Sequence, residues 1–177
     1  DESTQRRDRC LDTLRSLLTT ACDAVLEMRV VEGRCIEDDL KRHVDSIESS
    51  LGLIRERAPR LNELYADRIK QRMQTMLGQI GAEIREEDVL REVAIFAEKS
   101  DISEEIDRLT GHIERCLELI DGDGSKPVGR TMDFVAQEML REANTIGSKC
   151  LDADVSRHVV DIKVAIDRVK EQVQNVE

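Results

Sequence analysis

Aromatic side chains are almost absent from this sequence. Its 177 residues contain no Trp, one Tyr and two Phe, so a hydrophobic core must be built from Leu, Ile, Val, Met and Ala. Proline is also rare, with two residues, and long stretches therefore contain nothing that would interrupt a helix. With 40% hydrophobic and 37% charged residues, the composition favours long amphipathic helices.

Several kinds of motif are missing as well. The five cysteines lie far apart and show no CxxC or Cys/His spacing typical of a zinc site, so we expect free thiols in a reducing cytoplasm. No apolar run is long enough to cross a membrane. No GxGxxG, phosphate-binding loop, GxSxG or HExxH motif is present. The sequence does not begin with Met, and we expect it to be part of a longer protein.

Acidic residues outnumber basic ones, and the formal net charge is −11. This balance argues against a surface that coats nucleic acid along its whole length. It is compatible with a local basic groove, or with carboxylates gathered around a divalent cation. The most basic stretch surrounds Pro59 and contains Arg55, Arg57, Arg60, Arg68, Lys70 and Arg72. We interpret it as a solvated surface, with a contact to RNA as the alternative.

Apolar residues recur at three- and four-residue steps along most of the chain, which predicts an all-α fold. The first helix is predicted over 4–58, with a bend or stutter at Gly33 where the register shifts. Pro59 then starts a second helix. These two helices are predicted to form a long antiparallel hairpin over residues 1–81, followed by a C-terminal helical bundle over residues 82–177.

The predicted bundle contains a helix over 86–99, a helix over 102–120 with Asp101 as its N-cap, and a helix from Arg130 until Gly147. The last helix begins at Asp152 or Asp154. Its apolar residues alternate at steps of four and three, which predicts a coiled-coil-like seam formed by Val155, Val159, Ile162, Ile166, Val169, Val173 and Val176.

Two polar stripes on these helices carry groups that could perform chemistry. Glu138 and Glu142 lie one turn apart on helix 130–147. The polar face of helix 102–120 carries Asp101, Glu105, Arg108 and His112. Spacing alone therefore raises the hypothesis of a divalent-metal site formed by Glu138, Glu142 and a carboxylate of helix 102–120. The alternative is that these glutamates belong to solvated helix surfaces.

Three blocks of the sequence resemble the YicC family of bacterial proteins. They are EVAIFAEKSDISEEIDRLTGHIERC (92–116), PVGRTMDFVAQEMLREANTIGSK (127–149) and KVAIDRVKEQVQNVE (163–177), and LEMRVVEGRCIEDDL (26–40) also fits the family's long-helix region. The resemblance covers nearly the whole chain, and the blocks that contain ANTIGSK and QVQNVE are highly specific. The family's N-terminal domain would precede residue 1.

The resemblance implies a metal-dependent endoribonuclease that cuts single-stranded or structured RNA. It also implies a ring-like homo-oligomer, a hexamer. Apart from the resemblance, we expect a cytoplasmic protein with no membrane or DNA partner. The implied cofactor is a divalent cation, Mn²⁺ or Mg²⁺. The alternative is a non-catalytic helical module for oligomerisation or protein interaction within an RNA-processing protein.

The resemblance also singles out individual polar residues of this chain. Carried over position by position, they are Asp101, Glu105, Arg108, His112, Asp133, Gln137, Glu138, Arg141, Glu142, Asn144 and Lys149. Within this set we expect Glu105, Glu138 and Glu142 to bind metal or water. His112 would complete the catalytic set by transferring a proton near neutral pH.

The remaining cationic and amide groups of the set are expected to bind the RNA phosphates. These are Arg108, Arg141, Asn144 and Lys149. A purely structural alternative exists, because glutamate and arginine on neighbouring helices also form interhelical salt bridges. That alternative would occupy Glu105, Arg108, Arg141 and Glu142.

Overall fold

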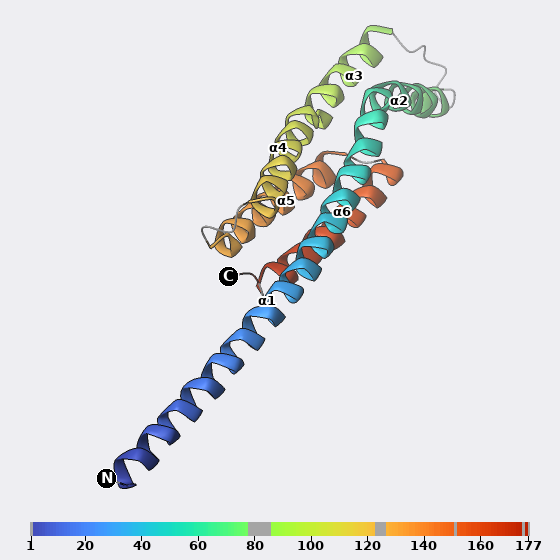
Figure 1. Ribbon diagram of the computed structural model, residues 1–177. Coiled ribbons are helices and arrows are strands. Elements are labelled where there is room, and N and C mark those ends of the chain that lie inside the picture. The colour runs from blue at the N-terminus through green and yellow to red at the C-terminus, as the bar shows by residue number, and fades with distance from the viewer. Residues whose placement is uncertain (1, 78–85, 123–126, 151, 175, 177) are drawn as a thin grey trace. The chain divides into compact units, whose positions relative to one another are not determined.

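The computed structural model describes residues 2–77, 86–122, 127–150, 152–174 and 176, and these are helical with short connections and no strand (Figure 1). The elements are α1 (Glu2–Arg57), the 3₁₀ helix η1 (Ala58–Arg60), α2 (Leu61–Leu77), α3 (Glu86–Ser100), α4 (Ser103–Ile120), α5 (Gly129–Lys149) and α6 (Ala153–Val173). The predicted all-α fold with a C-terminal bundle is confirmed. None of the described helices combines the length and the apolar character needed to span a bilayer.

Contacts divide the chain into residues 1–39 and residues 40–177. The domain boundary predicted between residues 81 and 82 lies outside the described residues. Residues 2–39 belong to α1, and Gly33 does not interrupt this helix. Every described side chain from residue 5 to residue 35 is exposed. The exposed set includes the large apolar residues Leu11, Leu14, Leu17, Leu18, Val25, Leu26, Met28, Val30 and Val31.

In residues 40–177, the second half of α1 contacts α4 and the start of α6. Its apolar residues Leu40, Val44, Ile47, Leu51 and Ile54 are buried. Two contacts at opposite ends fix the direction of α4 relative to α1. Arg55 Nη2 donates to Thr110 Oγ1 at 2.8 Å, whereas Lys41 Nζ lies 2.8 Å from Asp121 Oδ1. Because residue numbers rise along one helix as they fall along the other, the two helices are antiparallel.

The later helices continue this alternation. Lys149, at the end of α5, contacts Glu105, near the start of α4, so these helices are also antiparallel. Each contributes an apolar row to the core, as expected for an antiparallel helical bundle. The rows consist of Ile106, Leu109, Ile113 and Cys116 in α4, of Met132, Val135, Met139, Ala143 and Ile146 in α5, and of Val155, Val159, Ile162, Ile166, Val169 and Val173 in α6.

Two glycines permit close packing of these helices. The prediction that Gly147 ends its helix is wrong, because α5 continues to Lys149. A Cβ atom at Gly147 would lie 3.1 Å from Val159 Cγ1, so this glycine lets α5 and α6 approach each other. A Cβ atom at Gly129 would collide with the carbonyl oxygen of Val176. Gly129 therefore allows the C-terminal backbone to lie against the start of α5.

Between α1 and α4 the chain forms η1, α2 and α3. Pro59 lies in η1, which agrees with the prediction that it interrupts and restarts the helix. The sequence predicted α1 as the hairpin partner of α2, but the main contacts of α2 are with α3 and η1. One of these contacts joins α2 to α3: the rings of Tyr65 and Phe96 stack with centroids 3.4 Å apart and an interplanar angle of 8°.

The start of α6 is held by a residue that the sequence singled out. Asp152 is its N-cap, and Asp152 Oδ1 accepts hydrogen bonds from the backbone N–H groups of Asp154 at 3.0 Å and Val155 at 3.1 Å. The same carboxylate accepts hydrogen bonds from Arg57 Nε and Nη2 at 2.9 and 3.1 Å. One side chain thus caps α6 and connects it to the end of α1.

Candidate functional site

The antiparallel arrangement of α4 and α5 brings four charged residues together. Glu105 and Arg108 lie one turn apart near the start of α4, while Glu142 and Lys149 lie two turns apart near the end of α5. Glu105 is 3% exposed and Glu142 is 5% exposed. We refer to these four residues as the charge cluster. Buried carboxylates are rare unless they are paired, so this cluster is the principal candidate site.

Arg108 bridges the two glutamates. Its Nε lies 3.1 Å from Glu142 Oε1, and its Nη2 lies 3.3 Å from Glu105 Oε1. Lys149 Nζ adds a second cation, 2.8 Å from Glu105 Oε1, and donates to the backbone carbonyl of Asp101 at 3.1 Å. Two cations therefore neutralise two buried carboxylates, and every one of these contacts uses only one oxygen of each glutamate.

The second oxygen of each glutamate has no partner. Glu105 Oε2 and Glu142 Oε2 are buried and accept no hydrogen bond from any described residue. An unsatisfied buried acceptor costs about 1–3 kcal/mol, and more when it is charged. Such groups are uncommon in folded proteins and call for an explanation, such as a bound ion or water or a catalytic role. This pair of oxygens distinguishes the cluster from a fully satisfied structural ion pair.

The surroundings of Arg108 keep it positively charged. Burial alone would lower the pKa of Arg108, but the hydrogen bond that Arg108 donates to Glu142 and the charges of Glu142, Glu104 and Glu105 together raise it above its ordinary value. The prediction of Asp101 as the N-cap of α4 is wrong by one residue, because Ile102 holds that position. Asp101 Oδ1 nevertheless accepts a hydrogen bond from the backbone N–H of Ser103 at 2.9 Å. This bond lowers the pKa of Asp101, which therefore stays ionised at neutral pH.

The other residues singled out from the sequence lie outside these contacts. Glu138 Oε2 is 3.6 Å from Nη1 of Arg141, which is exposed. His112 is partly exposed on α4, and Asn144 is exposed on α5. The structure thus joins Glu105, Arg108, Glu142 and Lys149, and contacts between them and Glu138, Arg141, Asn144 or His112 are not among the described interactions. The roles assigned to individual residues stay predictions.

The donor set offers a limited fit to a divalent cation. No group of three or more His, Cys, Asp or Glu side chains in the described residues is arranged to hold a metal ion. Glu105 and Glu142 nevertheless supply two hard oxygen donors with unused lone pairs. Mg²⁺ is often held by one or two carboxylates together with water and substrate phosphates, so a two-glutamate site matches that pattern. Metal binding stays a prediction.

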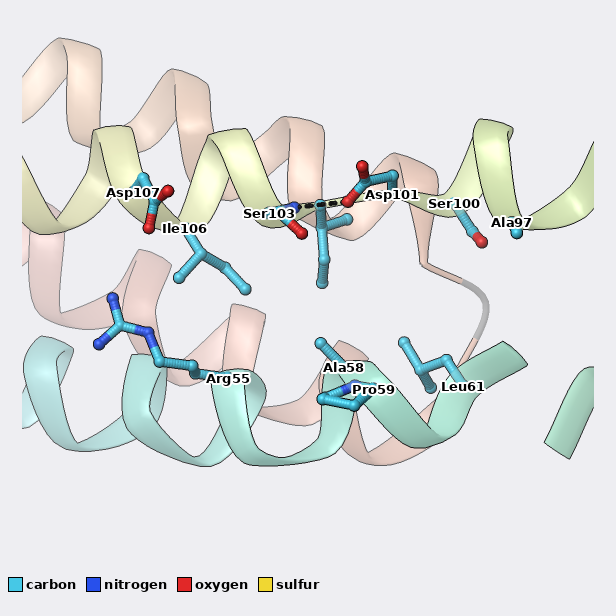
Figure 2. Close-up of a pocket in the computed structure, with 11 residues that line it drawn as sticks. Arg55, Ala58, Pro59, Leu61, Ala97, Ser100, Asp101, Ser103, Ile106 and Asp107 are labelled. Carbon is cyan, nitrogen blue, oxygen red and sulfur yellow. Dashed lines mark hydrogen bonds between the residues drawn. The ribbon is translucent and has the colours of Figure 1, made fainter. Parts of the chain in front are cut away.

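A second feature is a groove of about 610 Å³ where the end of α1 and η1 face the junction of α3 and α4 (Figure 2). Arg55 contributes to one wall, and Asp101, Ser103 and Asp107 contribute to the other. Apolar residues line both sides as well, with Ala58, Pro59 and Leu61 on the side of Arg55, and Ala97, Ile102 and Ile106 on the side of the acidic residues. Sequence reasoning missed this groove, because no motif links Arg55 to Asp107 and only their tertiary proximity defines it.

Comparison with known proteins adds independent information. Residues 54–177 match the family model described as endoribonuclease YicC-like, C-terminal. The chain belongs to the YicC-like family. It is 36% identical over 170 residues to a probable endoribonuclease YicC of Clostridioides difficile (strain 630), an alignment that covers 94% of this chain. It is 32% identical over 177 residues to a probable endoribonuclease YicC of Haemophilus influenzae (strain ATCC 51907 / DSM 11121 / KW20 / Rd), with 98% of this chain covered.

These comparisons confirm the family resemblance seen in the sequence blocks. The match to the YicC-like C-terminal model includes every member of the charge cluster and every residue that lines the groove. The alignments cover only 57% and 60% of the length of the two relatives, so the chain spans less than two thirds of each.

Proposed function

We propose that the YicC-like protein to which this chain belongs is an endoribonuclease that cleaves phosphodiester bonds of RNA, and that the charge cluster forms part of its active site. The family match and the names of the two relatives support RNA cleavage. The observation that carries the location of the site is the pair of buried glutamate oxygens without partners. A cluster that served stability alone would have no reason to retain them.

The cationic members of the cluster are suited to phosphate. The side chain of Arg108 is 43% exposed and that of Lys149 is 35% exposed, whereas the glutamates beneath them are buried. A phosphate group of RNA can therefore approach the two cations from solvent and form charge-assisted hydrogen bonds with them. Such contacts neutralise the charge that develops on the phosphate oxygens during cleavage. Arg141 and Asn144, which are exposed on α5, would extend the phosphate-binding surface.

The proposed activity depends on a divalent cation, Mn²⁺ or Mg²⁺, that Glu105 and Glu142 would hold together with water and the RNA phosphate. When bound, such a cation lowers the pKa of a coordinated water and stabilises the leaving oxygen. The glutamate oxygens are closed to solvent, so Arg108 must withdraw before they become accessible. An incoming phosphate would favour this movement by offering the guanidinium a new partner. His112, one turn beyond Arg108, is the proposed proton-transfer group.

The test is cleavage of a fluorescent RNA oligonucleotide by the purified full-length protein, with Mn²⁺ or with a chelator. We expect cleavage with the metal only, and a loss of about 100-fold or more in Glu142→Gln, the scale of a missing acid–base or ligand group. The matched control is Glu171→Gln, an exposed glutamate of α6 that pairs only with Arg168 in the described contacts. Equal cleavage by Glu142→Gln and wild type would reject the site.

An alternative function is supported by a separate observation. The large apolar side chains of residues 2–39 are exposed, which is typical of surfaces that associate. We propose that a homo-oligomer, a hexamer by family resemblance, covers this surface. If the protein were only a helical association module, it would oligomerise without cutting RNA.

One double variant tests the proposed association surface, and the cleavage assay then separates the two functions. Leu14→Ser/Leu18→Ser removes two exposed leucines from this surface, and we expect a smaller assembly in light scattering. The control Thr13→Ser/Thr20→Ser changes two exposed threonines that already bond only to the preceding helical turn. An unchanged mass would reject the proposed interface. Persistent absence of cleavage in an intact, correctly assembled protein would favour the association module over the enzyme.

A further inference from the structure

We propose that the groove lined by Arg55 and Asp107 binds one unpaired guanine of an RNA strand. The proposed active site does not use these residues, because the groove faces α1 and η1, whereas the charge cluster faces α5. The inference rests on the proposed function in one respect only, which is that RNA is the ligand. The groove would select the RNA sequence or hold the strand beside the site of cleavage.

The size of the groove and its apolar lining suit a nucleobase. Its volume of about 610 Å³ lies within the roughly 300–1,000 Å³ of small-ligand sites. Pro59 is exposed and Ala58 is partly exposed on the η1 side of the groove, and Ala97 is partly exposed on the α3 side (Figure 2). A flat base buries its faces favourably against such surfaces, since every base has an apolar π-face.

The two charged walls face each other. Figure 2 shows the guanidinium of Arg55 and the carboxylate of Asp107 pointing toward one another, yet no ion pair joins them among the described contacts. Arg55 is held in place, because its Nη2 donates to Thr110 Oγ1 at 2.8 Å and that hydroxyl donates to the carbonyl of Ile106 at 2.8 Å. The remaining N–H groups of Arg55 and both oxygens of Asp107 are left for a ligand.

Guanine matches this pair of walls better than the other RNA bases. Its O6 and N7 are two adjacent acceptors, which arginine recognises with two hydrogen bonds. Its N1–H and N2–H₂ are adjacent donors, and a carboxylate accepts two hydrogen bonds from such a pair. Adenine presents a donor beside N7 and so offers arginine only one acceptor there. The base must be unpaired, because the N1–H and N2–H₂ edge is occupied in a duplex.

The test measures binding without cleavage. Fluorescein-labelled UUGUU and UUAUU are titrated with the full-length protein in a chelator, and affinity is followed by fluorescence anisotropy. We expect UUGUU to bind about tenfold or more tightly, which is within the discrimination of one bidentate contact. Hydrogen exchange monitored by mass spectrometry supplies a second measurement, in which UUGUU slows exchange in the segment 97–107.

Two substitutions test the walls individually. Arg55→Gln and Asp107→Asn should each lower the affinity for UUGUU by about 5- to 150-fold and remove its advantage over UUAUU. Both residues are exposed, so the variants should remain folded, which circular dichroism checks. Arg115→Gln is the matched control, since Arg115 is an exposed arginine of α4 that pairs only with Glu118 in the described contacts. This control should keep the preference.

Equal binding of UUGUU and UUAUU would overturn the proposal, as would an unchanged preference in Asp107→Asn or protection confined to other segments. These failures are distinct from failure of the proposed enzyme. A guanine preference in a protein that never cleaves RNA would leave the groove standing and reject the nuclease. Cleavage of RNA without any guanine preference would support the nuclease and overturn the proposed guanine site.

Discussion

The two parts of α1 carry the same kind of apolar pattern but differ completely in burial. Before residue 39, Leu14 is 56% exposed and Leu18 is 64% exposed, whereas after it Val44 and Ile47 are 0% exposed. Both pairs are spaced at three or four residues and so define one face of a helix. The comparison shows that periodicity determines which face is apolar but does not determine what covers it.

The cysteines provide the largest expected contrast between the two parts. Cys10, Cys22 and Cys35 are exposed in the first part, whereas Cys116 and Cys150 are buried in the second. Burial raises the pKa of Cys116 from 9.0 to about 11, and burial also raises the pKa of Cys150. Since the thiolate is the nucleophile, we expect iodoacetamide to label the three exposed thiols about 100-fold faster or more.

Mass spectrometry of labelled peptides measures these rates, with the unfolded chain in urea as the control in which all five thiols react alike. Slow labelling of Cys10 and Cys22 that becomes fast on dilution would show that association covers residues 2–39. Fast labelling of Cys116 in the folded protein would contradict the bundle.

Truncation of one core residue should give the next largest effect. Ile47→Ala removes a fully buried side chain, and we expect the free energy of unfolding to fall by about 2–5 kcal/mol. The matched substitution Leu18→Ala removes an exposed side chain, for which we expect a change within about 0.5 kcal/mol. Urea denaturation at low protein concentration measures both. Equal costs would show that the two parts of α1 are equally covered.

The cap of α6 should contribute less than a core residue. Asp152→Ala removes the N-cap and the ion pair with Arg57, and we expect a loss of about 1–2 kcal/mol in the free energy of unfolding. Asp154→Ala is the control, because Asp154 Oδ2 also contacts Arg57, at 2.9 Å, but its side chain is more exposed and does not cap the helix. A larger loss for Asp154→Ala would show that charge outweighs capping here.

The smallest expected effect is the pH dependence of this cap. The hydrogen bond from Arg57 lowers the pKa of Asp152 below its ordinary value of 3.8. The stabilising contribution is therefore complete above this ordinary value and is lost as the pH falls through the lower pKa of the folded state. Asp152→Asn should weaken this acid dependence in thermal unfolding between pH 5 and 2. An identical acid profile in wild type and variant would reject the assignment.

Much of the fold follows from local features of the sequence. The apolar rows of α4, α5 and α6 are buried as their spacing predicts, Pro59 interrupts the helix, and Asp152 starts α6. The prediction was wrong for Val176, which lies beyond the end of α6 and is only partly buried. Gly147 misled the prediction because its role is not local. It accommodates Val159 of a neighbouring helix, and nothing in the flanking residues distinguishes this from a helix stop.

Only part of the candidate site could be predicted from the sequence. Glu138 and Glu142 look equivalent in sequence, but a step of four residues also moves a side chain about 6 Å along the helix axis. Arg108 reaches Glu142, and the described partner of Glu138 is Arg141. The groove between Arg55 and Asp107 depends on residues far apart in the chain and left no local signal.

The sequence by itself determined where helices form and which face of each is apolar, because helical periodicity and capping involve residues within a few positions of one another. Only the tertiary structure decided which apolar faces are covered and which charges meet. The antiparallel packing of α4 and α5 places Glu105 and Glu142 on either side of Arg108 and leaves one oxygen of each glutamate without a partner in the part of the chain that the structure describes.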